Sequence, residues 1–155
     1  MPYYYHKKIG YNYRLSNVSA GIGCGQMEVL QDHLDARRSH HDHYAAGLSD
    51  INGVSVLCNP NEKYNSNFWL TTIQLDPEKI KKSPDEVRLS LEAENIESRL
   101  IWRPMHMQPV FADAPYYGGE VSKQIFDRGL CLPSSSSLTY EQIERIIDAL
   151  HRILK

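Results

Sequence analysis

The last segment of the chain constrains the fold most strongly, because it carries an apolar face at helical spacing. Its apolar side chains recur every three or four positions, the period of an amphipathic α-helix. They are Ile143, Ile146, Ile147, Leu150, Ile153 and Leu154. Thr139 and Gln142 stand just before them in the pattern of a capping box. Other elements must cover such a face, so the chain needs a second layer that packs against this helix.

The rest of the pattern predicts helices that alternate with short strands. A long helix is expected from Ser16 or Asn17 to the turn Asn52-Gly53, and another helix from the N-cap Ser83. Strands are predicted at residues 54–58, 68–75, 98–102 and 130–132, and a short helix at 120–128. Gly129 is predicted to end this short helix as its C′ residue. This order favours the α/β class, as a two-layer α+β sandwich in which a single domain, residues 1–155, packs helices on a small sheet.

Composition excludes several classes of partner. The 155 residues carry 17 Lys+Arg and 19 Asp+Glu, and the net charge of 17 − 19 = −2 lacks the basic excess of nucleic-acid binders. No apolar run approaches the roughly 18 residues of a membrane span, and we expect neither a nucleic-acid nor a membrane partner. Three distant cysteines, Cys24, Cys58 and Cys131, indicate reduced and mostly buried thiols in a cytoplasmic protein.

Two motifs suggest chemistry but favour a structural interpretation. The run Gly21-Ile22-Gly23-Cys24-Gly25 resembles a nucleotide loop, yet it lies inside a helical pattern, and close helix packing is the better interpretation. Four histidines, His33, His40, His41 and His43, lack the spacing of a zinc helix and alternate with charged residues. We interpret them as part of a solvated face and predict no metal site.

Covalent catalysis has no evident carrier in this sequence. There is no Gly-x-Ser-x-Gly elbow, and no cysteine has a base beside it in the sequence. Every lysine lies in a charged or polar stretch, which is typical of a protonated, solvated amine rather than a Schiff-base nucleophile. We therefore predict no catalytic residue.

Two segments carry polar groups that a purely structural explanation leaves unused. The tyrosine-rich segment, Tyr3 to Ser16, includes Gly10-Tyr11-Asn12-Tyr13-Arg14 directly before a predicted helix N-terminus, where anions are favoured. The segment 96–111 brings Arg99, Arg103 and His106 from a strand into a proline-braced loop, in which regular structure is not expected. Arginine suits the binding of carboxylate or phosphate.

These two segments, together with Gly129-Leu130-Cys131-Leu132-Pro133-Ser134, resemble the C-terminal portion of DegT/StrS-type sugar aminotransferases. The resemblance runs from about Ile9 to the end of the chain. It implies the small C-terminal domain of a fold-type I enzyme that uses pyridoxal 5'-phosphate. Such enzymes transfer an amino group from an amino acid, usually glutamate, to a nucleotide-linked keto sugar, and they are commonly homodimers.

The resemblance also implies roles for five residues. Asn12 and Arg14 would contact the cofactor phosphate of a neighbouring subunit, while Arg103 and His106 would contact the sugar nucleotide. Arg99 would clamp a substrate carboxylate. Structural alternatives remain open: Asn12 as a turn cap, Arg14 or Arg99 in an ion pair, and His106 as a packed loop residue.

The family's catalytic lysine and most of its phosphate cradle belong to a large domain that precedes the Gly-Tyr-Asn-Tyr-Arg motif. Only about nine residues precede the motif in this sequence. We therefore expect an excised C-terminal domain, without the large cofactor-binding domain, that neither holds the cofactor covalently nor transaminates alone. The alternative is a noncatalytic α/β module that binds a ligand or a protein partner through its tyrosine-rich segment.

Overall fold

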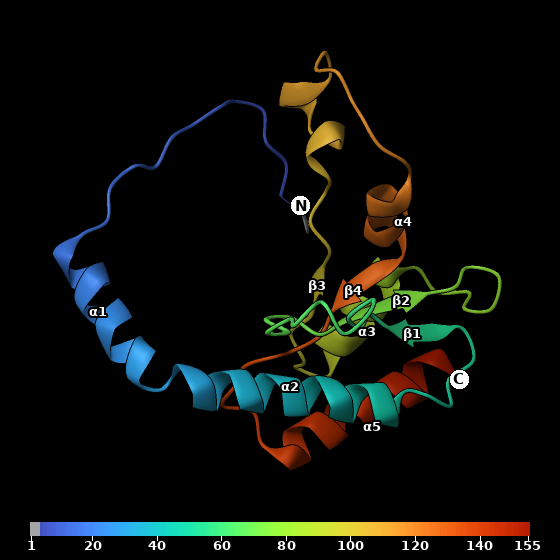
Figure 1. The fold of residues 1–155 in the computed structure, drawn as a ribbon. Coiled ribbons are helices and arrows are strands. Elements are labelled where there is room, and N and C mark those ends of the chain that lie inside the picture. Colours follow the sequence, from blue (N-terminus) through green and yellow to red (C-terminus); the bar gives the residue numbers. More distant parts are fainter. Residues whose placement is uncertain (1–3) are drawn as a thin grey trace.

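The computed structural model describes residues 4–155 and shows helices packed on a small sheet (Figure 1). The elements are α1 (Asn17–Glu28), α2 (Leu30–Gly47), β1 (Val54–Val56), β2 (Thr72–Leu75), α3 (Pro84–Ala93), β3 (Arg99–Leu100), the 3-10 turns η1 (Met105–Met107) and η2 (Pro109–Phe111), α4 (Val121–Arg128), β4 (Gly129–Cys131) and α5 (Tyr140–Leu154). Tyr3 of the tyrosine-rich segment lies outside the described residues.

The four strands form one antiparallel sheet in the order β1-β2-β4-β3. Cys131 of β4 is opposite Thr72 on one side and Arg99 on the other. Helices α2, α3 and α5 form a layer on one face of this sheet, and Figure 1 shows α4 on the other side. The predicted sandwich of helices on a small sheet is confirmed.

The core lies between the sheet and α5. The apolar face predicted for this helix is buried, with Ile143 and Leu150 exposing 1% and 0% of their surface. It packs with buried side chains of α2, α3, β2 and β4, namely Tyr44, Leu48, Val87, Leu91, Ile73 and Leu130. The capping box is formed as predicted, because Thr139 Oγ1 accepts from the Gln142 amide and Gln142 Oε1 accepts from the Thr139 amide. Sequence period and capping therefore fix α5 and its buried face.

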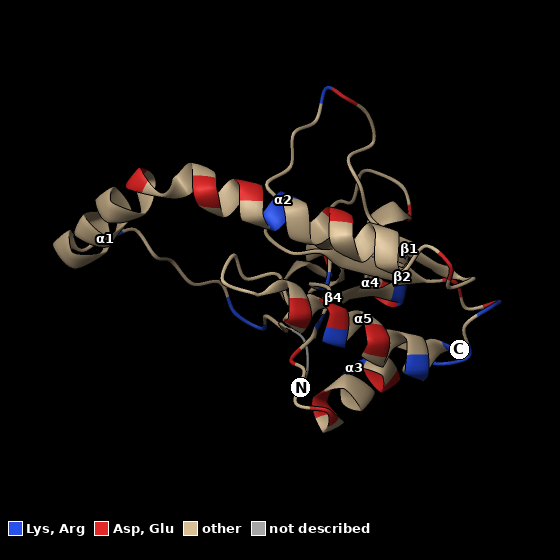
Figure 2. Cartoon of the chain, turned by 90° about the horizontal axis from the view of Figure 1, so that it is seen from below, with Lys and Arg blue, Asp and Glu red and all other residues tan. Residues whose placement is uncertain are grey.

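The predicted long N-terminal helix is two helices. It begins as expected with Ser16 as N-cap, but Val29 leaves helical geometry (φ −116°, ψ 13°) and separates α1 from α2, which ends at Gly47. Helix α1 buries no residue and carries no charge before Glu28 (Figure 2). Its glycines meet no other part of residues 4–155 within 4 Å, so the predicted close packing has no partner in the described chain. Within the same range, no helix is both long and apolar enough to cross a membrane.

Three further predictions need correction. The strand predicted at 68–75 begins only at Thr72, because Phe68 has a left-handed φ of 42°. The proline-rich loop contains the short turns η1 and η2, since proline suits the first position of a helical turn. Gly129 is not a left-handed C′ residue but the extended start of β4 (φ −102°). Glycine is needed there for space, because a Cβ atom would stand 2.5 Å from the Ile125 carbonyl oxygen.

The unequal burial of α1 and α5 predicts unequal effects of the same substitution. Ile143→Ala should lower the free energy of unfolding by about 2–5 kcal/mol, because it opens a cavity in the core. Ile22→Ala, at a position 62% exposed on α1, should change it by less than about 0.5 kcal/mol. Urea unfolding of both variants measures the difference, and equal losses would contradict the assignment of the core.

Candidate functional site

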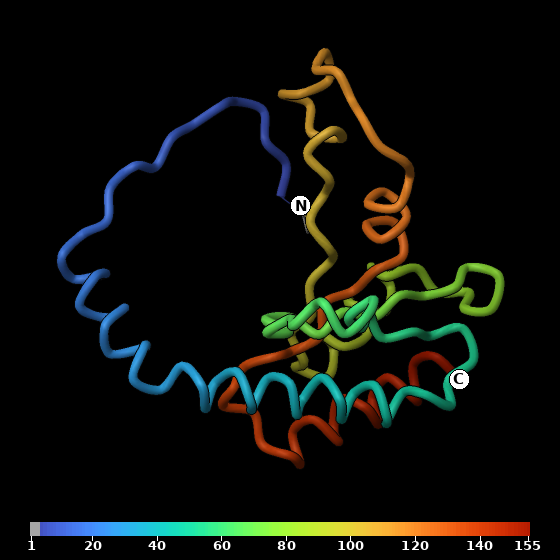
Figure 3. The backbone as a smooth tube through the Cα atoms, viewed as in Figure 1, coloured from blue at the N-terminus to red at the C-terminus, as the bar shows by residue number. Residues whose placement is uncertain are grey.

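Strand β3 leads the chain out of the sheet into the loop 102–111, where one buried glutamine holds three backbone groups. Gln108 is 2% exposed. Its Oε1 accepts from the His6 amide at 2.9 Å, and its Nε2 donates to the Tyr4 and Arg103 carbonyl oxygens at 3.2 Å each. Figure 3 shows the start of the described chain near this loop, and from there the chain runs in a wide arc to α1. Gln108 therefore joins the N-terminal segment to the loop.

Both tryptophans of the chain lie beside this junction. The Trp69 and Trp102 rings stack with centroids 5.6 Å apart, and Tyr4 stacks on Trp102 at 6.3 Å. Trp69 is 59% exposed and Trp102 43%. Large exposed aromatic rings are typical of binding surfaces, because they offer apolar area at little entropic cost.

Arg103 and His106 both lie on this loop. The Arg103 guanidinium lies over the rings of Tyr5 (5.8 Å) and Phe126 (5.3 Å), so it bridges the N-terminal segment and α4. The half-buried His106 ring stacks on Tyr116 with centroids 4.1 Å apart. The loop thus presents one cation and one imidazole among aromatic side chains.

Arg99 forms an ion pair with a neighbouring carboxylate. Its guanidinium donates to Glu97 Oε1 through Nε at 2.9 Å and Nη2 at 2.6 Å. This hydrogen bond and the Glu97 charge raise the pKa of Arg99, which stays protonated. Because the pair is exposed, the ion pair adds little stability. A substrate carboxylate at Arg99 would have to compete with Glu97.

The segment before α1, which includes Asn12 and Arg14 in the sequence, runs as an extended arc (Figure 3). Both are exposed, and within residues 4–155 neither makes a hydrogen bond or an ion pair. The structure therefore does not bring them to Arg103 and His106. Their side chains are available to a surface outside the described residues.

The exposure of the lysines does not favour a Schiff-base role for any of them among residues 4–155. Every lysine among residues 4–155 is exposed except Lys123, which is half-buried. Lys123 Nζ donates to Asp127 at 2.8 Å, and this contact raises its pKa. A Schiff-base nucleophile needs the opposite shift, toward the neutral amine.

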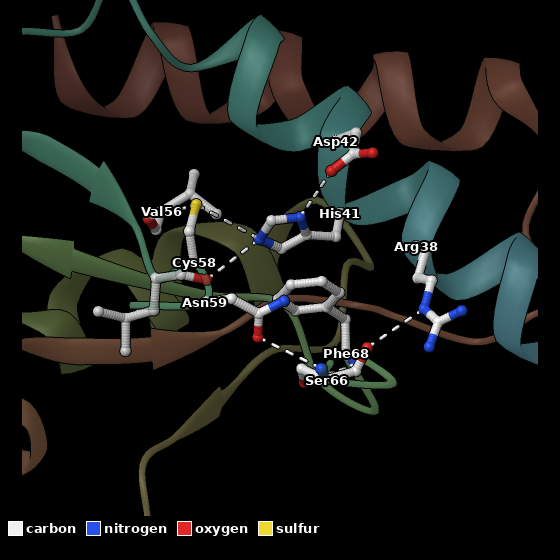
Figure 4. Close-up of polar contacts among 9 residues, drawn as sticks. Arg38, His41, Asp42, Val56, Cys58, Asn59, Ser66 and Phe68 are labelled. Carbon is white, nitrogen blue, oxygen red and sulfur yellow. Dashed lines mark hydrogen bonds and ion pairs between the residues drawn. The ribbon is translucent and has the colours of Figure 1, made fainter. Parts of the chain in front are cut away.

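Sequence reasoning missed four features of the molecule. No local pattern marks Gln108 as a buried clamp or pairs Trp69 with Trp102. The histidine cluster is not simply a solvated face, because His41 is 3% exposed and its Nε2 lies 3.8 Å from Cys58 Sγ (Figure 4). The thiols are not mostly buried either: Cys24 and Cys58 are exposed, and only Cys131 is buried.

Comparisons with known proteins agree with one another. The family model of the DegT/DnrJ/EryC1/StrS aminotransferase family matches residues 1–151. EpsN of Bacillus subtilis (strain 168), classed as a pyridoxal phosphate-dependent aminotransferase, is 40% identical over 96% of this chain and 38% of its own length. GDP-perosamine synthase of Caulobacter vibrioides is 31% identical over 97% of this chain and 40% of its own.

A solved structure shows the same fold. The crystal structure of a DegT DnrJ EryC1 StrS aminotransferase from Brucella abortus superposes with a TM-score of 0.78 at 25% identity, over 97% of this chain and 39% of that protein. The chain therefore spans about two fifths of the length of the relatives that it matches.

The Gln108 contacts predict that this residue keeps the N-terminal segment on the loop. Gln108→Leu leaves three backbone groups without their partner, which should cost about 1–3 kcal/mol and speed tryptic cleavage after Lys7 and Lys8. Gln31→Leu, which removes one exposed hydrogen bond to Asp35, is the matched control. Equal cleavage rates in the two variants would show that Gln108 does not hold the segment.

Proposed function

The chain belongs to the DegT/DnrJ/EryC1/StrS aminotransferase family, and from this premise we propose that it supplies the sugar-nucleotide side of a pyridoxal phosphate-dependent transaminase. The reaction transfers an amino group from an amino acid, with glutamate as the expected donor, to a keto group of a nucleotide-linked sugar. The match over residues 1–151 carries this proposal. The cofactor supplies the electron sink for the amino transfer.

The loop 102–111 suits one end of such a substrate. Trp69 and Trp102 are partly exposed aromatic residues of the kind that contact a base or a sugar ring, and Arg103 offers a planar cation for phosphate oxygens. His106 stands on the same loop with its ring plane fixed by Tyr116. We assign Arg103 and His106 to binding and orienting the sugar nucleotide.

The N-terminal segment suits a contact with a second subunit. Asn12 and Arg14 are exposed, and α1 presents Val18, Ile22 and Met27 to solvent with no covering element among residues 4–155. An apolar helix of this kind gains stability when another surface covers it. We propose a homodimer in which Asn12 and Arg14 reach the cofactor phosphate of the neighbouring subunit, with Arg99 at the carboxylate of the amino donor. The free thiols fit a cytoplasmic protein.

We propose further that the Schiff-base lysine is not among the lysines of this sequence. The amines of residues 4–155 are exposed or ion-paired, so they lack the buried surroundings that a covalent anchor of the cofactor needs. The chain on its own is then inactive and corresponds to a small C-terminal domain. Its residues bind and orient substrate, and the anchoring amine comes from elsewhere in the assembled enzyme.

Borohydride reduction tests the assignment of the lysine. The purified chain is mixed with pyridoxal 5'-phosphate, reduced, digested and mapped by mass spectrometry. We expect sparse labelling spread over exposed lysines and no amino transfer, because no lysine among residues 4–155 is buried. Stoichiometric labelling of one lysine together with turnover would refute the proposal.

A graft tests the function itself. In EpsN, the region that matches this chain is replaced by residues 1–155, and amino transfer from glutamate to nucleotide-linked keto sugars is measured. Cofactor absorbance and the circular dichroism spectrum show whether the graft has assembled. We expect turnover in an assembled graft, and an assembled graft that does not transfer would contradict the proposal.

Variants of the same graft test the two loop residues. Arg103→Gln and His106→Gln should raise KM for the sugar nucleotide about 10-fold or more, the loss expected for about 1.4 kcal/mol of binding free energy. His33→Gln, on α2, is the matched control and should leave KM unchanged. A KM unaffected by either loop variant would remove that residue from the binding site.

A further inference from the structure

A nucleophile and two titratable side chains meet away from the loop 102–111. Cys58 follows β1, and His41 and Asp42 lie on α2 (Figure 4). His41 Nε2 is 3.8 Å from Cys58 Sγ and 3.1 Å from the Leu57 carbonyl oxygen, while His41 Nδ1 is 3.0 Å from Asp42 Oδ1. The order carboxylate, imidazole, thiol is one that can hold a thiolate.

The imidazole is held in this position from several sides. His41 is 3% exposed and stacks on the Phe68 ring with centroids 3.6 Å apart and an interplanar angle of 13°. Phe68 is placed by its left-handed backbone and by its amide, which donates to Ser66 Oγ at 3.0 Å. Arg38 Nε donates to the Ser66 carbonyl oxygen at 3.2 Å, and this contact ties the same loop to α2. The ring nitrogens therefore face fixed partners.

The hydrogen-bond partners of His41 favour the transfer of a proton from Cys58 Sγ to His41 Nε2. A neutral imidazole has one N–H, so it can donate either to Asp42 or to the Leu57 carbonyl, but not to both. A doubly protonated ring donates to both oxygens. Its Nε2–H and its positive charge then also face Cys58 Sγ. An exposed carboxylate on one side and a thiolate on the other balance that charge.

We propose that Cys58 is a selectively reactive thiol, a modification site for soft electrophiles that His41 and Asp42 activate. The proton leaves Cys58 Sγ for His41 Nε2, and the thiol gives up its hydrogen bond to the Val56 carbonyl at 3.4 Å. With an alkyl iodide, the thiolate forms the new S–C bond and iodide leaves with the electron pair of the C–I bond. The exposed position of Cys58 admits the reagent. The adduct would lie at the start of the loop between β1 and β2. Trp69, in the same loop, stacks on Trp102.

The other two cysteines are internal references. Cys24 on α1 is exposed like Cys58, but within residues 4–155 it has no hydrogen-bond partner. Cys131 is buried, and burial raises the pKa of its thiol. Exposure alone therefore predicts equal reaction of Cys24 and Cys58, whereas activation by His41 predicts faster reaction of Cys58.

Alkylation kinetics test the inference on the full 155-residue chain. The chain is diluted until sedimentation shows it to be monomeric, so that α1 and Cys24 stay uncovered. It is then treated with iodoacetamide at pH 7, and the modification of each cysteine peptide is followed by mass spectrometry. We expect Cys58 to react about 10-fold faster than Cys24, and Cys131 to react slowest. Rates for Cys58 that equal or fall below those of Cys24 would overturn the proposal.

Two variants separate activation from simple accessibility. His41→Gln should bring the Cys58 rate down to that of Cys24, and Asp42→Asn should lower it several-fold while the Cys24 rate stays constant. Asp42 is 79% exposed at its side chain, so this variant keeps the fold even if His41→Gln does not, as circular dichroism will show. An unchanged Cys58 rate in folded Asp42→Asn would also overturn the proposal.

Discussion

Burial of one face of α5 is the interaction on which the rest of the structure depends. Its apolar side chains fill the space between α2, α3 and the sheet, and polar contacts in its last turn join it to the ends of α2 and α3. His151 Nε2 donates to the Gly47 carbonyl at 2.8 Å, and Arg152 Nη2 donates to Glu94 Oε2 at 2.7 Å. The sheet is held against this layer, with the Tyr44 hydroxyl donating to the Pro133 carbonyl at 3.0 Å. The path of β3 into the loop 102–111 follows from that arrangement.

The molecule consists of a packed body and an N-terminal segment whose apolar side chains are exposed. Residues 9–28 are exposed throughout, although they include tyrosines, isoleucines and a glycine-rich helix without charge before Glu28. Gln108 joins Tyr4 and His6, which precede these residues, to the loop, and α2 follows them into the core. The relatives that this chain matches are about two and a half times longer, and we propose that the exposed segment contacts other parts of the assembled enzyme.

Local sequence signals predicted the elements that local interactions determine. The two capping boxes, at Ser83 and Thr139, placed the starts of α3 and α5, because the side chain and the backbone amide that bond lie three residues apart. The break at Val29 has no such signal, since neither a proline nor a side-chain cap marks it. The pattern predicts a strand at Phe68, since aromatic residues favour strands, yet this residue has a left-handed backbone and stacks on His41.

The site was predictable only in part, for the same reason. The resemblance named Arg103 and His106, and the structure brings both onto one loop, but it leaves Asn12 and Arg14 distant and pairs Arg99 with Glu97. Gln108 joins groups more than 100 positions apart in the sequence, and Trp69 and Trp102 meet across the fold. Contacts of this kind depend on tertiary structure and leave no periodic trace in the sequence.

Nuclear magnetic resonance of the isolated chain tests most directly whether the loop 102–111 binds a sugar nucleotide. The chain has two tryptophans, and both lie beside this loop. Their indole N–H signals therefore report on ligand binding at the loop. On titration with a nucleoside diphosphate sugar, the account predicts shifts of both indole signals and of the His106 ring signals, with α1 and α5 unaffected. Shifts confined to other elements, or none at millimolar ligand, would contradict it.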